Sequence, residues 1–106
     1  MAFFEKTVSR ETVYRGKIIN VRSDRAELSN GSIVGREVVE HRGGVAVVAI
    51  DENDCVLLVR QFRYPFSREL LEIPAGKLEV DERPLDCAVR ELSEETGCSA
   101  GRIIDL

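Results

Sequence analysis

The segment at residues 76–98, GKLEVDERPLDCAVRELSEETGC, constrains the fold of this chain more than any other. Pro84 and Gly97 bound a predicted helix, because proline favours the first helical position and glycine the residue just past the end. Three acidic residues then fall in the carboxyl-terminal half of that helix: Glu91, Glu94 and Glu95. The negative end of the helix dipole disfavours carboxylates, and two glutamates one turn apart cost about 0.2–0.5 kcal/mol through repulsion. Acidic residues placed against these preferences indicate that a cation binds there.

The same helix is expected to pack an apolar face on a sheet. With about 100° between successive residues, one face gathers five residues: Leu85, Ala88, Val89, Leu92 and Thr96. Glu91 and Glu95 lie at the edge of this face, and Glu94 lies further round. Arg83 is a poor N-cap, because its side chain cannot accept a hydrogen bond from the first N–H groups of the helix. The acidic edge is therefore expected to border the loop that begins at Ala75.

Composition indicates a soluble globular protein with room for one domain. Of the 106 residues, 43% are hydrophobic and 32% are charged, which is typical of that class. The formal net charge of −4 argues against non-specific nucleic-acid binding, and no apolar run reaches membrane-spanning length. Cys55, Cys87 and Cys98 form no CxxC pair and are typical of reduced thiols in a cytoplasmic protein. We therefore expect neither a nucleic-acid nor a membrane partner.

Strand patterns fill the chain before the helix. Three segments predict an antiparallel β meander over residues 1–42: residues 12–20, 24–28 and 33–40. The second and third flank Asn30-Gly31, the strongest short hairpin signal that a sequence carries. Gly43-Gly44 is a candidate hinge between this meander and the main body of the chain.

Three further strands are predicted before the helix: residues 45–50, 55–62 and 69–73. The first, VAVVAI, is continuously apolar, as expected of a strand covered on both faces. The second is also predicted to be buried, and Pro74 stops the third. The helix would pack its apolar face on the sheet that these strands form.

The acidic edge of the helix suits a divalent cation bound to a phosphate-bearing substrate. Mg²⁺ prefers oxygen ligands and takes one or two carboxylates together with substrate phosphates. Glu91 and Glu95 supply two carboxylates one turn apart. A backbone carbonyl from the loop beside Gly76 can complete the set, because glycine lets the chain approach closely. The alternative is a solvated helix face, which is the usual role of a charge cluster.

The spacing of the acidic segment resembles the signature of the Nudix hydrolases. Every fixed position of that signature is present: Gly76, Glu82, Arg90-Glu91-Leu92, Glu94-Glu95 and Gly97. A spaced pattern of this length is far more specific than a short glycine motif. Two positions depart from the family, namely Cys98, where a large aliphatic residue is usual, and Asp81, where glycine is common.

Upstream segments resemble the ADP-ribose pyrophosphatase branch of that family. They are REVVEH at residues 36–41, GGVAVVAID at 43–51, LLVRQFRYP at 57–65 and LLEIPAGKLE at 70–79. The resemblance implies an α/β fold, an α/β/α sandwich around a mixed sheet, in which residues 43–106 are an incomplete catalytic domain. It also implies further strands, another helix and a loop with a general-base glutamate, which this sequence does not contain. The chain is therefore expected to be the amino-terminal portion of such an enzyme, weakly active or inactive by itself.

The resemblance implies a role for each residue of the helix site. Glu91 and Glu95 would hold Mg²⁺ or Mn²⁺ together with the Ala75 carbonyl. Glu94 would be a further metal ligand or would position water. Arg90 would orient the glutamates as an ion-pair partner. The remaining motif residues would support this site: Glu82, also assigned to the catalytic set, and Gly76.

Two arginines are implied in substrate binding. Arg63, in the RQFR segment, would contact the substrate. Arg36, in REVVEH, would reach a substrate held by the partner subunit, because the family exchanges amino-terminal strands in a homodimer. Strand-end arginines are also common as surface residues, which is the alternative interpretation for both.

The implied function is metal-dependent hydrolysis of the pyrophosphate of ADP-ribose, or of a related nucleoside diphosphate sugar, to AMP and ribose 5-phosphate. Two alternatives use the same helix. One is a Nudix pyrophosphatase that acts on a nucleoside triphosphate, coenzyme A or a GDP-sugar, and the other is a non-catalytic nucleotide-binding module. The upstream strand segments favour ADP-ribose over other nucleotides, and the intact helix glutamates favour catalysis over binding alone.

Overall fold

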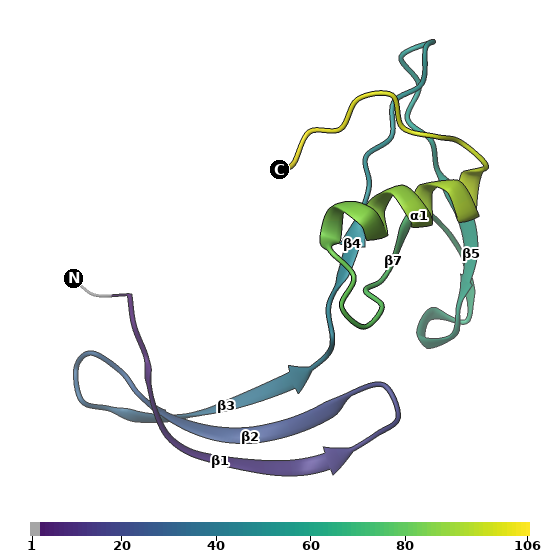
Figure 1. Cartoon of the computed structure of the whole chain (residues 1–106). Helices are drawn as coiled ribbons and strands as arrows, with labels where there is room; N and C mark the ends of the chain where they lie inside the picture. The colour runs from purple at the N-terminus through teal and green to yellow at the C-terminus, as the bar shows by residue number, and fades with distance from the viewer. Residues whose placement is uncertain (1–2) are drawn as a thin grey trace. The chain divides into compact units, whose positions relative to one another are not determined.

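The first unit of the chain is an antiparallel β meander. The computed structural model describes residues 3–106, and the chain divides into two compact units, Met1–His41 and Arg42–Leu106. The first unit contains three strands in the sheet order β1-β2-β3 (Figure 1): β1 (Lys6–Arg15), β2 (Asn20–Glu27) and β3 (Ile33–Glu40). Both pairings are antiparallel, as the meander prediction requires.

The second unit contains two short antiparallel strand pairs and a helix. Its elements in chain order are β4 (Gly44–Ala46), β5 (Val59–Arg63), the 3₁₀ helix η1 (Tyr64–Phe66), β6 (Arg68–Glu72), β7 (Ala75–Lys77) and α1 (Pro84–Thr96). β4 pairs with β7, and β5 pairs with β6. The helix packs against β4 and β7, and Figure 1 shows it crossing these two strands.

The hairpin predicted at Asn30-Gly31 is confirmed. The Gly31 N–H donates to the Leu28 carbonyl at 2.9 Å, and Gly31 has φ +87°, a conformation that glycine adopts without a steric cost. The bounds of the predicted first strand are wrong. Residues 16–19 form the turn between β1 and β2, closed by the Gly16 N–H and the Ile19 carbonyl at 2.8 Å. The two isoleucines in that turn are residues typical of strands, but the chain reverses its direction there.

The continuous strand predicted at residues 45–50 is also wrong in extent. β4 ends at Ala46, and Ile50 makes only an isolated bridge with Val56. Exposure alternates along the segment, so that Val48 is 57% exposed whereas its neighbours at 47 and 49 are half-buried. In residues 3–106 this segment is therefore covered on one face only. The predicted strand at 55–62 is replaced by β5 at 59–63, which is exposed at alternate positions and not buried as predicted. The strand predicted at 69–73 corresponds to β6 within one residue.

The helix begins and ends where the sequence predicts. Pro84 is its first residue, and Gly97 follows it with φ +72° and donates its N–H to the Ser93 carbonyl at 2.9 Å. Arg83 makes no capping hydrogen bond through its side chain, as expected. Asp81, in the loop before the helix, has φ +59°. Aspartate tolerates this conformation better than most residues but less well than glycine.

The face that the helix packs on the sheet differs from the predicted one. Leu85 and Val89 are 48% and 41% exposed, whereas Cys87 and Leu92 are buried. Glu91 and Glu95 project between those two buried residues on a helical wheel and are themselves half-buried. The glutamates therefore lie within the packed face, not at its edge. The helix can pack this way because the strand opposite offers a glycine instead of a side chain.

The fold class is α/β, as expected. The strand pairings of residues 3–106 are all antiparallel, and α1 is the one α-helix in this part of the chain. The parallel pairing of a mixed sheet and the second helical layer of a sandwich are thus not found in the residues described. Neither α1 nor any other helix within residues 3–106 has the length and apolar character needed to span a bilayer.

Candidate metal centre

The contact between Gly76 and Glu91 brings the helix onto β7. A Cβ atom added to Gly76 would lie 2.0 Å from Cδ and 2.1 Å from Oε1 of Glu91. No side chain fits there while the carboxylate holds its position, because real Cβ contacts do not approach so closely. Glycine in this motif therefore provides the space in which a carboxylate lies against the strand backbone.

The outer edge of β7 offers backbone groups to the helix. In the β4–β7 ladder, Val47 donates to the Pro74 carbonyl at 2.8 Å and Leu78 donates to the Gly43 carbonyl at 3.1 Å. Hydrogen-bonded and non-hydrogen-bonded pairs alternate along an antiparallel ladder. Ala75, which pairs with Ala46, accordingly has both its N–H and its carbonyl directed away from β4. That edge faces the side chains of α1.

Glu95 is held at this edge by two uncharged donors. The Ala75 N–H donates to its Oε2 at 3.2 Å, and the Gln61 side-chain amide donates to its Oε1 at 3.3 Å. The donors come from β7 and β5, so the carboxylate joins the helix to both strand pairs. Neither donor carries a charge.

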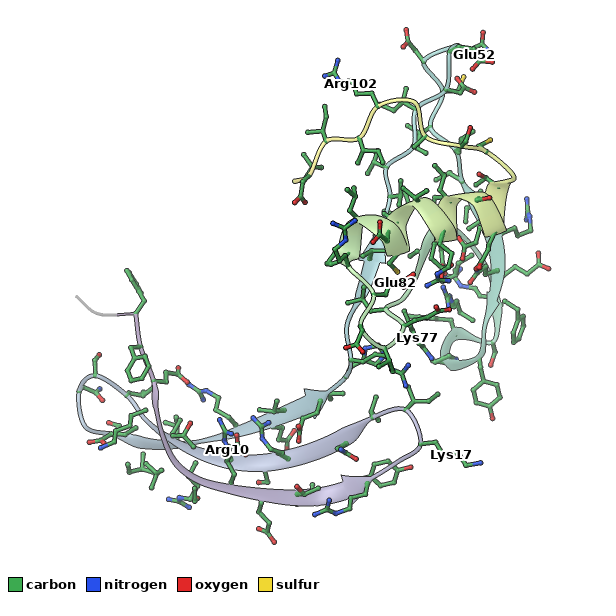
Figure 2. The ribbon with its side chains drawn as sticks, viewed as in Figure 1. Arg10, Lys17, Glu52, Lys77, Glu82 and Arg102 are labelled. Atoms are coloured by element: carbon green, nitrogen blue, oxygen red, sulfur yellow. The ribbon has the colours of Figure 1, made fainter. Side chains whose placement is uncertain are left out.

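Arg90 is the centre of a charged network beside Glu91. It binds Glu82 in a bidentate pair, with Nε–Oε2 and Nη2–Oε1 distances of 2.8 Å, and it donates through Nη1 to Glu91 Oε1 at 2.8 Å. It also donates to the Lys77 carbonyl at 3.2 Å, a second group on the free edge of β7. Figure 2 shows Lys77 and Glu82 beneath the first turns of α1. Arg90 thereby connects helix, strand and loop.

The Glu82 carboxyl is strongly stabilised in its charged form. Its hydrogen bonds with the Arg90 guanidinium, followed by one from the Glu79 N–H, lower its pKa from 4.5 to about 2. The same pairing with Glu82 raises the pKa of Arg90. Cys87 lies below this pair and is fully buried, and burial raises the pKa of its thiol. The network is therefore a fixed ion pair packed over an uncharged thiol.

The three helix glutamates have different surroundings. Glu91 and Glu95 face β7, whereas the Glu94 side chain is 59% exposed and accepts a hydrogen bond from Arg90 at 3.2 Å. Across residues 3–106, no three histidine, cysteine, aspartate or glutamate side chains converge closely enough to hold a metal ion. The structure thus brings together Glu91, Glu95 and the Ala75 edge, and leaves Glu94 on the outside.

Both predicted substrate arginines are paired with glutamates. Arg63 of β5 binds Glu72 of β6 through two hydrogen bonds, and this pairing raises the pKa of Arg63, with a smaller contribution from Glu95. Arg36 of β3 binds Glu5 at 2.9 and 2.8 Å in the first unit. Arg63 is therefore near the helix site, and Arg36 belongs to the first unit.

Three residues of this network were not identified from sequence: Gln61, Glu72 and Cys87. A signal for the first exists, because residues two apart on a strand share a face, so Gln61 lies on the same side of β5 as Arg63. The position of Cys87 against the strand could not be found in this way, since the helical wheel alone does not show which side of the helix meets the strand.

The donor groups fit a hard divalent cation. Beside Ala75 and Gly76 the helix side chains that face β7 are the Glu95 and Glu91 carboxylates, and the backbone contributes the Ala75 carbonyl, so the donors at this point of the edge are oxygens. Mg²⁺ and Mn²⁺ prefer such ligands, whereas sulfur or imidazole ligands would favour Zn²⁺. The one nearby sulfur, Cys87, is buried beneath Arg90 and hydrogen-bonds the Lys77 carbonyl.

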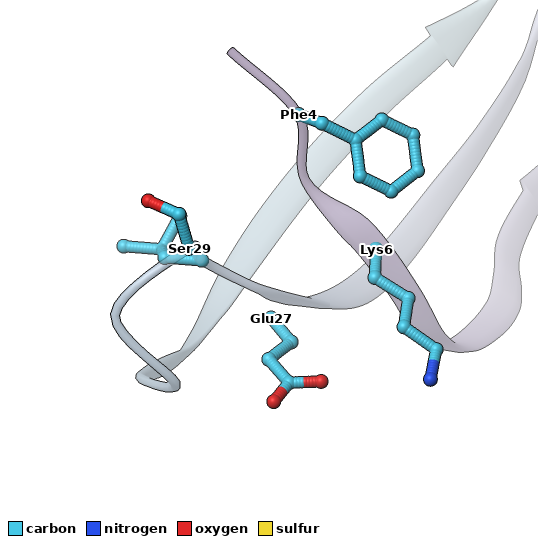
Figure 3. A pocket seen from close by; sticks show the side chains of 5 residues that line it. Phe4, Lys6, Glu27 and Ser29 are labelled. Atoms are coloured by element: carbon cyan, nitrogen blue, oxygen red, sulfur yellow. The ribbon is translucent and has the colours of Figure 1, made fainter. Parts of the chain in front are cut away.

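The first unit contains a hollow. It is lined by Phe4, Lys6, Glu27, Leu28 and Ser29 (Figure 3). Lys6 and Glu27 are register partners of β1 and β2, and Phe4 is 71% exposed. The hollow contains none of the predicted site residues.

Comparison with known proteins matches two domain families along the chain. The NUDIX domain matches residues 40–106, and the nucleoside diphosphate sugar hydrolase N-terminal domain matches residues 5–39. The chain is 46% identical to an ADP-ribose pyrophosphatase of Bacillus subtilis over 93% of its own length and 54% of the relative. It is 45% identical to a methanol dehydrogenase activator of Bacillus methanolicus, over 90% of its length and 51% of the relative.

A solved structure agrees with these matches. The crystal structure of an ADP compounds hydrolase superposes with a TM-score of 0.69 at 29% identity, covering 92% of this chain and 54% of that one. The chain therefore spans about half the length of the relatives it matches. Since the NUDIX domain covers more than half of its residues and includes the helix and strand edge described above, the chain belongs to the Nudix family.

Proposed function

We propose that this protein hydrolyses the pyrophosphate bond of ADP-ribose, or of a related nucleoside diphosphate sugar, to AMP and ribose 5-phosphate. The observation that carries the proposal is the Glu91 carboxylate packed against Gly76, beside a Glu95 carboxylate held by two uncharged donors. The names of the relatives support the substrate class, since one is an ADP-ribose pyrophosphatase and the solved structure is an ADP compounds hydrolase.

Glu91, Glu95 and the Ala75 carbonyl would hold Mg²⁺ or Mn²⁺, with Glu94 as a further ligand or a residue that positions water. A bound divalent cation neutralises pyrophosphate oxygens and lowers the pKa of a coordinated water, which favours in-line attack at phosphorus. The Glu94 side chain is on the outer side of the helix, where it pairs with Arg90. To bind the metal it would have to break this pair and turn towards the substrate.

The other residues of the network would fix the ligands in place. Glu82 is the main partner of Arg90 and largely balances the positive charge of the guanidinium. The hydrogen bond from Arg90 to Glu91 therefore adds little positive charge at Glu91. It would orient the Glu91 carboxylate without neutralising the site. Arg63 would bind a substrate phosphate through its guanidinium, which suits planar oxygen groups, after exchanging its contact with Glu72.

We also propose a cytoplasmic homodimer in which Arg36 contributes to the partner's substrate site. The free cysteines Cys55, Cys87 and Cys98 are consistent with a reducing compartment. A dimer that exchanges amino-terminal strands predicts twice the chain mass in solution. A single-chain mass at high protein concentration would contradict it.

The test of the proposed function is AMP release from ADP-ribose by the full-length protein, with and without Mg²⁺. Glu91→Gln keeps the size of the side chain but removes its charge, and we expect at least a hundredfold loss of turnover, the size of effect typical when a preorganised charged group is lost. Glu52→Gln is the matched control, because Glu52 is an exposed glutamate in the turn before β5. Normal turnover by Glu91→Gln would refute the proposal.

The same assay separates the alternatives. A panel with nucleoside triphosphates, coenzyme A and GDP-sugars identifies a Nudix enzyme with another substrate, if one of them is cleaved faster than ADP-ribose. Calorimetry that shows tight ADP-ribose binding without AMP release would identify a nucleotide-binding module instead of an enzyme. The similarity to a protein named as a methanol dehydrogenase activator is the reason to include this measurement.

A further inference from the structure

Gln61 makes a contact that the proposed mechanism does not yet use. Its side-chain amide donates to Glu95 Oε1 at 3.3 Å across 34 positions of sequence. Gln61 is half-buried on β5, and the same carboxylate receives the Ala75 N–H on its other oxygen at 3.2 Å. Each carboxylate oxygen of Glu95 thus has one donor, and the two donors fix the plane of the group.

The chemistry of these donors differs from that at Glu91. Glu91 is oriented by Arg90, a cation whose charge is balanced by Glu82. Glu95 is oriented by neutral amides, which hold a carboxylate in place without offsetting its negative charge. A lysine or arginine at position 61 would orient Glu95 as well but would compete with a metal ion for it. Glutamine orients the carboxylate and does not compete with a metal ion for it.

Gln61 also connects the carboxylate to the arginine expected to bind substrate. Residues two apart on a strand share a face, so Gln61 and Arg63 project from the same side of β5. Arg63 is held by Glu72 from β6. A single strand therefore presents a donor for Glu95 and a guanidinium for an anion, one beside the other.

We infer that Gln61 is a positioning residue that fixes the orientation of Glu95 and thereby sets the affinity of the site for a divalent cation. This inference rests on the proposed function, in which Glu95 is a metal ligand. Hydrogen-bond partners of metal ligands typically change metal affinity by about 10–100-fold when they are removed. A neutral donor is expected at the lower end of that range.

The experiment is a Mn²⁺ titration of the protein, followed by the electron paramagnetic resonance signal of free Mn²⁺. Gln61→Met keeps the length of the side chain and removes the donor, and we expect Mn²⁺ affinity to fall about tenfold. Turnover should return towards that of the unmodified protein at saturating Mn²⁺, because the ligands themselves are intact. Asn53→Ala, which removes an amide from the exposed turn before β5, should leave Mn²⁺ affinity unchanged.

Unchanged Mn²⁺ affinity in Gln61→Met, with Glu95→Gln weakened, would overturn the inference and leave the proposed function standing. Unchanged affinity in both Glu95→Gln and Glu91→Gln would instead remove the metal site and the proposed function with it. If Gln61→Met fails to fold by circular dichroism, Gln61→Asn replaces it, since its shorter side chain retains the polarity but cannot reach Glu95. The expected loss of Mn²⁺ affinity is the same.

Discussion

The two units of this chain each contain an arginine bound to a glutamate in bidentate fashion, but the two pairs differ in their surroundings. In the second unit, the Arg90 and Glu82 side chains are 24% and 13% exposed, and Arg90 also binds Glu91 and a backbone carbonyl. In the first unit, Arg36 and Glu5 are 44% and 45% exposed. An arginine–glutamate pair is therefore part of a network in the second unit and a surface contact in the first.

This difference shows why an ion pair alone does not identify a site. Exposed pairs gain little, because water screens the attraction and two long side chains lose freedom. A partly buried arginine with several partners is constrained in position, and so are the carboxylates it binds. Arg90 can therefore orient the helix glutamates, whereas the contact of Arg36 with Glu5 is easily exchanged for another anion. The predictions below test that contrast, from the largest expected effect to the smallest.

The largest effect is expected from Gly76→Ala. The new methyl group would occupy the space of the Glu91 carboxylate, with a Cβ–Cδ distance of 2.0 Å if nothing moved. Because the clash is with the flexible end of a side chain, the fold should survive and the carboxylate should move. A displacement of about 1 Å at a catalytic group lowers the rate about a hundredfold, so we expect a similar fall in AMP release and a weaker Mn²⁺ titration.

Gly35→Ala is the matched control in the first unit. A Cβ atom at Gly35 meets nothing within 4 Å, so the substitution should not destabilise the fold and Mn²⁺ affinity should remain unchanged. If Gly76→Ala binds Mn²⁺ as tightly as the unmodified protein, the carboxylate does not need its place against the strand, and the geometric basis of the site is wrong.

A smaller effect is expected for acid stability through Glu82. Its pKa of about 2 lies below the ordinary value of 4.5, so the folded state favours the charged form. The resulting stabilisation is fully present above about pH 4.5 and is lost as the pH falls towards about 2. Urea unfolding should therefore show a free energy of unfolding that decreases across this interval more steeply in the unmodified protein than in Glu82→Gln.

Near the lower end of that interval, the free energy of unfolding should have the same pH dependence in the unmodified protein and in Glu82→Gln. A difference that persists unchanged at low pH would show that Glu82 stabilises the fold by packing and not through its charge. Glu52→Gln, in an exposed turn, should follow the unmodified protein at every pH.

The smallest effect on stability is expected from Arg36→Gln. Its partner Glu5 is well solvated, so we expect no measurable change in the urea midpoint. Under the proposed dimer, the same variant should raise KM for ADP-ribose severalfold, because the guanidinium would contact the substrate. A clear loss of stability with normal KM would make Arg36 a structural residue of the meander and remove it from the substrate site.

The sequence predicted the ends of the helix well, because they depend on local rules. Pro84 and Gly97 set the helix ends through backbone preferences that act within a few residues. The hairpin at Asn30-Gly31 is set in the same local way. The spacing of Glu91 and Glu95 follows from the helical period, and the family assignment follows from the spacing of the whole motif.

Tertiary structure decided which face of the helix packs on the strands and what holds each glutamate. Leu85 and Val89 belong to the apolar stripe but are substantially exposed, whereas the glutamates lie in the packed face. That outcome depends on the space above Gly76 and on Gln61, a residue 34 positions from Glu95. Periodicity within a helix describes its own faces, but only the shape and donors of the opposing strand determine which of them is buried.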